Sequence, residues 1–173
     1  MHQPLNSFRL NVGFLINKPV GYSRDFPFEL QYTHLPPDLD LYKVSGSAKI
    51  TRTAQGLLVL VKLQASVSAE CVRCLKPFHQ PLNIEFTELY AFSKKSATDA
   101  EFVLPEDAQI NLEPLTREYM LLDVPISPLC QPDCKGLCPI CGDNLNETTC
   151  DHKNEVIDPR LAALKSLIEK KQD

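Results

Sequence analysis

The stretch that decides the fold of this chain is CQPDCKGLCPICGDNLNETTCDH, residues 130–152, which holds five of the seven cysteines. Within it, Cys138-Pro-Ile-Cys141-Gly142 has the form of a zinc knuckle. In such a knuckle two thiolates hold one ion and the glycine lets the backbone turn tightly. Gly136 stands in the same relation to the sulfur ligands on either side of it. The stretch therefore predicts a metal centre around which the rest of the chain is organised.

Eight cysteine and histidine side chains are candidate ligands, and a structural zinc ion takes four. The most economical division gives two zinc sites, made from Cys71, Cys74, Cys130 and Cys134 and from Cys138, Cys141, Cys150 and His152. The first site would join the tip of a predicted hairpin to the chain that enters the cysteine-rich stretch. An alternative division places the first two cysteines with Cys138 and Cys141. Spacing also leaves open a single zinc, a chain without structural metal, and His79 as a replacement ligand.

Upstream of the cysteines, alternation of apolar and polar residues predicts an antiparallel sheet. Every odd position from Leu57 to Ala69 is apolar, so one face of this strand is expected to be buried. Residues 42–53 alternate in the same way, and a short turn at residues 54–56 joins the two runs into a hairpin. Three further alternating runs predict strands at residues 8–12, 26–32 and 82–92.

Two helices complete an α+β reading of the chain. Leu112, Leu115, Tyr119 and Leu122 recur at helical spacing, and a second helix is expected over residues 158–168. Residues 93–109 are polar and acidic, which favours a mobile loop. We therefore expect an antiparallel β-rich domain over residues 1–125, with one helix and a Cys-x-x-Cys hairpin tip. A cysteine-rich zinc module with the C-terminal helix is expected over residues 126–173.

Charge and composition narrow the classes of function. The 173 residues carry a formal net charge of −4, and residues 93–129 hold three basic against seven acidic residues, so bulk electrostatics disfavour a polyanion partner. The early apolar run at residues 12–16 is too short for a signal-peptide core. We therefore expect a cytoplasmic protein, in which clustered thiols point to metal before disulfides.

The sequence contains none of the common catalytic motifs. It has no P-loop, dinucleotide fingerprint or G-x-S-x-G, and neither Cys-x-x-Cys pair lies in the strand-turn-helix setting of a thioredoxin. Zinc sites with four protein ligands also leave no open coordination position for water. We expect a protein that is not an enzyme.

Four pieces of the sequence, at residues 70–78, 111–125, 129–146 and 158–167, together resemble the large ribosomal RNA subunit accumulation protein (YceD) family of bacteria and plastids. The resemblance implies a cytoplasmic, non-enzymatic ribosome biogenesis factor that supports synthesis, processing or stability of large-subunit (23S) ribosomal RNA. It implies no membrane and no small-molecule substrate. Many members end the cluster with Cys-x-Cys, whereas this chain has Cys150-Asp-His152, and histidine can replace a thiolate at zinc.

Two classes of partner remain open. In the first, the chain contacts ribosomal RNA through the basic residues Lys43, Lys49, Lys62, Arg73, Lys76 and Lys135. In the second, it is a zinc-stapled protein-interaction module whose acidic middle, Asp99 to Glu118, holds a basic ribosomal protein or assembly factor. The charge distribution favours the second class.

Overall fold

The structure is a computed structural model that describes residues 8–93 and 102–152. The elements of these residues are β1 (Arg9–Asn11), α1 (Gly13–Ile16), β2 (Ser23–Leu35), β3 (Leu39–Arg52), β4 (Gly56–Glu70), β5 (Pro77–Ala91), β6 (Phe102–Val103), β7 (Gln109–Asn111) and α2 (Glu113–Asp123). The described chain divides into two compact units. One contains residues up to 72 and from 76 to 130, and the other contains residues 73–75 and 131–152.

The first unit is built on a five-stranded sheet in the order β2-β3-β4-β5-β6. Neighbouring strands are antiparallel except β5 and β6, which pair in parallel at Tyr90↔Phe102. The expectation of a mostly antiparallel sheet with helices is confirmed, but the sheet is mixed. A parallel neighbour needs a crossover connection, which the alternation within a single strand does not reveal.

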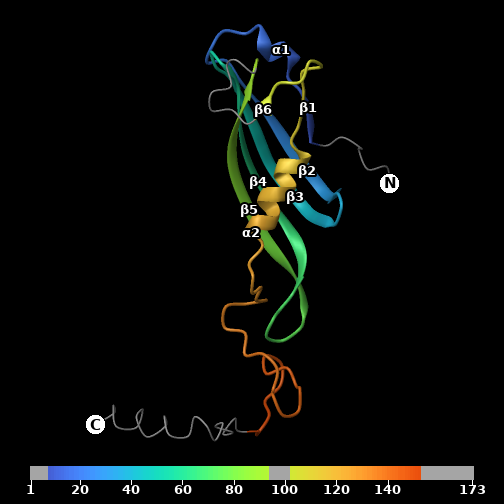
Figure 1. Cartoon of the computed structure of the whole chain (residues 1–173). Helices are drawn as coiled ribbons and strands as arrows, with labels where there is room; N and C mark the ends of the chain where they lie inside the picture. Colours follow the sequence, from blue (N-terminus) through green and yellow to red (C-terminus); the bar gives the residue numbers. More distant parts are fainter. Residues whose placement is uncertain (1–7, 94–101, 153–173) are drawn as a thin grey trace, which may run out of the picture. The chain divides into compact units, whose positions relative to one another are not determined.

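The core lies on one face of this sheet, where the odd positions of β4 are buried from Leu57 to Ala65 as expected, while Val67 and Ala69 are only half-buried. Helix α2 lies across this face in Figure 1, and its Tyr119 ring stacks on Phe86 of β5 with 4.4 Å between ring centroids. The short strands β1 and β7 pair with each other, and Leu10 and Ile110 face each other in that pair and are buried. Helix α2 thus covers the buried face of the sheet.

Helix α2 begins at Glu113, and its N-cap residue is Leu112, the first residue of the expected helical run. The side-chain oxygen of Asn111 accepts the Glu113 N–H at 3.1 Å, and Pro114 occupies the first turn. The expected stripe is wrong at its last position, because Leu122 is 81% exposed while Met120 is fully buried. The buried face therefore follows 112, 115, 116 and 120 rather than continuing to 122.

Other expectations need correction as well. Helix α1 is not indicated by the sequence pattern, and residues 93–109 contain β6 and the first residue of β7 rather than only a loop. The helix expected over residues 158–168 lies outside the described residues. Among the helices of residues 8–93 and 102–152, none is both long and apolar enough to cross a bilayer.

Candidate metal centre

The turn between β4 and β5 positions the first two cysteines. The Cys71 N–H donates to the Lys76 carbonyl at 3.0 Å, and Leu75 adopts a left-handed conformation with φ 56°. This closes a compact turn whose two cysteine side chains are both buried, at 0% and 4% exposure for Cys71 and Cys74. The turn therefore presents two sulfurs with the short spacing that one metal ion requires.

The second cysteine-rich loop folds as the knuckle that its sequence predicts. The Cys138 N–H donates to the Asp143 carbonyl at 2.8 Å, and the Gly142 N–H donates back to the Cys138 carbonyl at 2.9 Å. Gly142 has φ 78°, a conformation that favours glycine. Gly136 has φ 79°, and a Cβ there would lie 3.1 Å from the Arg73 carbonyl oxygen. Both glycines therefore adopt the left-handed conformation that favours glycine, and at Gly136 a side chain would also be tightly packed.

The ligand atoms of the eight candidate residues come together in two groups of four. Within each group all of these atoms lie within 4.8 Å of one another, in the sets Cys71, Cys74, Cys130, Cys134 and Cys138, Cys141, Cys150, His152. This is the more economical of the two divisions that spacing left open. Tetrahedral zinc with bonds of about 2.3 Å places its sulfur ligands roughly 3.8 Å apart, so both groups fit such an ion. Each of these cysteine-rich clusters can hold a metal ion.

Backbone hydrogen bonds tune the second group. The N–H groups of Cys141 and Ile140 donate to the Cys138 sulfur and lower the pKa of that thiol to about 6. At Cys141, a backbone hydrogen bond from Asp143 acts to lower the pKa. The Asp143 carboxylate, desolvation and the Cys138 sulfur outweigh this effect and raise the pKa to about 11. The Cys141 thiol accordingly donates to the Asp143 carboxylate at 3.2 Å. These hydrogen bonds favour the thiolate form of Cys138, which is the form that binds a metal ion.

Asn146 was not singled out by the sequence pattern, yet its side chain organises the loop around Cys134. Its side-chain N–H₂ donates to the Cys134 sulfur at 3.3 Å, and its oxygen accepts the Lys135 N–H at 2.8 Å. Arg73 also contacts this loop, donating to the Cys134 carbonyl at 2.8 Å. Hydrogen bonds from neighbouring residues orient metal ligands and delocalise thiolate charge. Only the three-dimensional path of the loop reveals this role.

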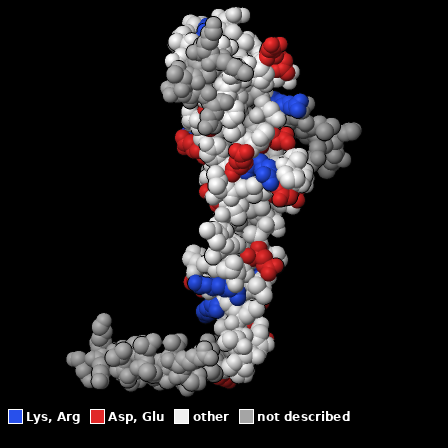
Figure 2. Space-filling view, viewed as in Figure 1, with Lys and Arg blue, Asp and Glu red and all other residues white. Residues whose placement is uncertain are grey.

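His79 and the six basic contact candidates lie outside the two ligand groups. His79 packs edge-on against the Tyr42 ring, at 5.1 Å between centroids, and belongs to neither ligand group. Lys62 forms an ion pair with Glu85 at 2.8 Å, and Arg73 is engaged by the Cys134 loop. All six candidates are exposed, namely Lys43, Lys49, Lys62, Arg73, Lys76 and Lys135. On the face seen in Figure 2, basic and acidic side chains are interspersed rather than gathered by sign.

The chain was compared with known protein families and with solved structures. A family model described as Large ribosomal RNA subunit accumulation protein YceD matches residues 59–168. This range includes all eight ligand candidates and both strands of the hairpin that carries Cys71 and Cys74, apart from the first residues of β4. No solved structure matches the chain.

Individual relatives come from bacteria and plants. An uncharacterized protein of Mycobacterium tuberculosis is 36% identical over 141 residues, which cover 79% of this chain and 64% of the relative. Uncharacterized protein YlbN of Bacillus subtilis is 32% identical over 105 residues, or 60% of each chain. Large ribosomal RNA subunit accumulation protein YCED homolog 1, chloroplastic, of Arabidopsis thaliana is 35% identical over 68 residues, 39% of this chain and 21% of the relative. The chain spans less than two thirds of the length of these relatives.

Proposed function

We propose, from the premise that this chain belongs to the YceD family of large ribosomal RNA subunit accumulation proteins, that it is a non-enzymatic ribosome biogenesis factor acting on 23S ribosomal RNA. The match over residues 59–168 confirms the resemblance noted from the sequence motifs. The proposal rests on one observation: a chain that matches this family also brings eight candidate ligands together in two groups of four. Such groups are typical of structural metal, which shapes a binding surface rather than a reaction centre.

Zinc is the ion that we propose for both groups. Four thiolates, or three thiolates and an imidazole, are the donor sets of structural zinc sites in small domains. We propose two ions per chain, held by the eight residues of the two groups. When bound, zinc supplies closed tetrahedral crosslinks, and the residues themselves determine which backbone segments are held together.

The absence of catalysis also belongs to the proposal. With all four positions of a tetrahedral ion filled by protein, neither group offers a site at which water could be activated. A depression on the sheet is lined by a lysine that is paired with a glutamate, by hydroxyl and amide groups, and by the apolar side chains of Leu63 and Ile84. Its lining residues include no nucleophile–base pair. A cytoplasmic location, expected from the sequence, completes this proposal.

A second candidate function is a zinc-stapled module that binds a basic ribosomal protein or assembly factor without touching RNA. The net charge of −4 and the scattered basic residues favour it, because a polyanion is attracted by clustered positive charge. Both candidates lead to the same cellular outcome, which is the accumulation of large-subunit ribosomal RNA.

The proposed function is tested in cells depleted of this protein. We expect 23S ribosomal RNA to fall relative to 16S, and the wild-type chain to restore it. Elemental analysis of the purified chain is expected to give close to two zinc ions per molecule, falling to about one in Cys74→Ser. Val72→Ser, at an exposed position in the same turn, is the control and should keep both ions. Unchanged 23S levels on depletion would contradict the proposed function. Purified protein that is folded but contains no metal would contradict the proposed zinc sites.

A further inference from the structure

The sheet has a second face that α2 does not cover, and the strand register defines it. Gln64 and Ser66 of β4 alternate with the buried Leu63 and Ala65, so they point to the opposite side of the sheet. Directly opposite residues in antiparallel strands share a face. Tyr42 lies opposite Ser66, and the pairs Ser45↔Gln64, Gln64↔Asn83 and Ser68↔His79 extend the same face across β3, β4 and β5.

Three rings form a row across this face. Tyr32 of β2 lies opposite Tyr42 of β3, and their ring centroids are 5.4 Å apart. The Tyr42 ring in turn contacts His79 of β5 at 5.1 Å, reaching over β4, where Ser66 and Ser68 have only small side chains. Tyr32 is 43% exposed and His79 is also exposed, so the row is accessible to a partner. We call Tyr32, Tyr42 and His79 the aromatic row.

One end of the aromatic row is held in place by hydrogen bonds. Asp40 accepts from the Tyr32 hydroxyl at 2.7 Å and contacts His34 Nδ1 at 2.8 Å. Hydrogen bonds from His34 and Tyr32 lower the pKa of the Asp40 carboxyl, which is therefore ionised at neutral pH. The Tyr32 ring is thus oriented before any ligand binds, which reduces the entropy lost on binding.

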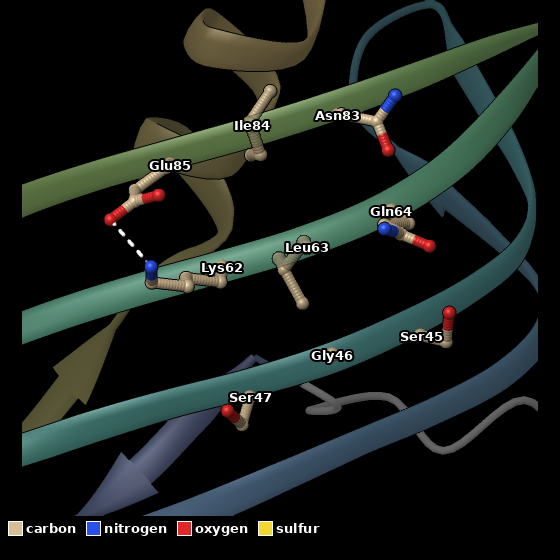
Figure 3. A pocket seen from close by; sticks show the side chains of 9 residues that line it. All are labelled: Ser45, Gly46, Ser47, Lys62, Leu63, Gln64, Asn83, Ile84 and Glu85. Atoms are coloured by element: carbon tan, nitrogen blue, oxygen red, sulfur yellow. Dashed lines mark ion pairs between the residues drawn. The ribbon is translucent and has the colours of Figure 1, made fainter.

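An open depression, lined by both polar and apolar groups, continues from the row. It has a volume of about 430 Å³ and receives residues from three strands. Figure 3 shows the amides of Gln64 and Asn83 on neighbouring strands and the hydroxyls of Ser45 and Ser47 on β3. Amides and hydroxyls both donate and accept hydrogen bonds, as the edges of unpaired bases do.

The charges of this face are largely balanced. Lys62 is paired with Glu85, and Lys49 stands opposite Asp25 in the strand register. A duplex, whose phosphates must be met by several cations, has little to bind here. Aromatic rings beside hydrogen-bonding groups are instead the combination that holds single strands, because every base has a face for stacking.

We propose that this face binds unpaired segments of ribosomal RNA, with bases stacked on the aromatic row and base edges bonded to Gln64 and Asn83. The inference rests on the proposed function and names its direct partner. It differs from the contact set expected from the sequence, which consisted of five lysines and one arginine. Recognition through bases rather than phosphates also reconciles an RNA partner with a chain of net charge −4.

The test is fluorescence anisotropy of the zinc-loaded full chain with a labelled, unstructured RNA of about 12 nucleotides. Tyr42→Ala is expected to weaken binding by about 5- to 150-fold, the range for loss of one base–aromatic stack. Tyr42→Phe keeps the ring and should stay within about twofold of wild type. Tyr22→Ala removes an exposed tyrosine outside the row and should also stay within about twofold. Thermal melts of each variant establish that it is folded.

Two further probes separate bases from phosphates. An abasic strand of the same length is expected to bind at least about tenfold more weakly, and the affinity is expected to fall only shallowly with salt, as for about two phosphate contacts. Equal binding of the abasic strand overturns the inference, as does unchanged affinity of folded Tyr42→Ala. If Tyr42→Ala fully restores 23S ribosomal RNA in depleted cells, this inference is overturned while the proposed function stands. A failure of the wild-type chain to affect 23S levels removes the function itself.

Discussion

Asn146 shows how a residue outside the ligand set prepares the cysteine-rich loop for metal. Its amide donates to the Cys134 sulfur and also accepts from the Lys135 backbone, so it ties the sulfur to the loop that carries it. The two groups of candidate ligands could be predicted because cysteine spacing along the chain indicates how many thiolates one ion can reach. Asn146 could not, since asparagine is common in turns and its partner depends on how the loop closes.

We predict that Asn146→Ala lowers the zinc affinity of the group containing Cys134 by about 10- to 100-fold, the usual effect of removing a hydrogen bond to a metal ligand. Competition with a chromophoric chelator measures this, and the affinity of the group containing Cys138 should stay unchanged. Gln131→Ala is the matched control, because Gln131 contacts the Asn146 oxygen at 3.2 Å and not the sulfur. Equal zinc affinity in Asn146→Ala and wild type would contradict the role given to this amide.

The strands β3 and β4 show both the strength and the limit of alternation as a predictor. The runs at 42–53 and 57–71 correspond to strands that pair as expected, because one buried face imposes a period of two. The register shifts between Tyr42 and Ser45, where Lys43 has φ 53°. This bulge puts Tyr42 on the face opposite to Val44, although both have even numbers, so the aromatic row could not be read from the sequence.

Gly46 lies just beyond this bulge, with φ 144°, and a Cβ there would be 2.1 Å from the Lys62 carbonyl oxygen of β4. We predict that Gly46→Ala lowers the free energy of unfolding by about 2 kcal/mol or more, because it combines backbone strain with a clash against a central strand. Chemical denaturation measures the change. Gly21→Ala is the control, since its φ is 91° but no atom lies within 4 Å of the added Cβ. Equal losses in the two variants would show that strain alone matters.

Helix α2 offers a test of which side faces the core. We predict that Met120→Ala lowers the free energy of unfolding by about 2–5 kcal/mol, because it leaves a cavity under the helix at a fully buried position. Leu122→Ala, on the same helix at 81% exposure, should change it by less than about 0.5 kcal/mol. Denaturant melts of both variants provide the comparison. A larger loss for Leu122→Ala would restore the helical stripe expected from the sequence.

At the scale of the whole molecule, the two units differ in what stabilises them. The sheet unit has a large apolar core, whereas in residues 131–152 the buried side chains are those of Cys134 and Cys138. The sequence anticipated this contrast through its change from alternating strands to clustered cysteines. The sequence pattern did not predict the parallel pairing of β6 with β5 or the pairing of β7 with β1, because contacts between short segments distant in the sequence leave no local pattern.

This contrast predicts a selective response to metal removal. The cysteine-rich unit cannot bury enough apolar surface to offset its chain entropy, so we expect its order to depend on zinc. The β4–β5 ladder is continuous from Gly56↔Ala91 to Glu70↔Pro77. We expect the half of this ladder nearer Gly56 to stay ordered without zinc. Hydrogen exchange with mass spectrometry, with and without a strong chelator, measures this. Chelation is expected to speed exchange at residues 134–146 and to leave protection around Val59 and Val61 unchanged.

Re-addition of zinc should restore the slow exchange, which separates metal loss from irreversible damage. Protection of residues 134–146 that survives chelation would show that the loop folds by its own hydrogen bonds. Simultaneous loss of protection in β4 would show that the sheet itself requires the metal.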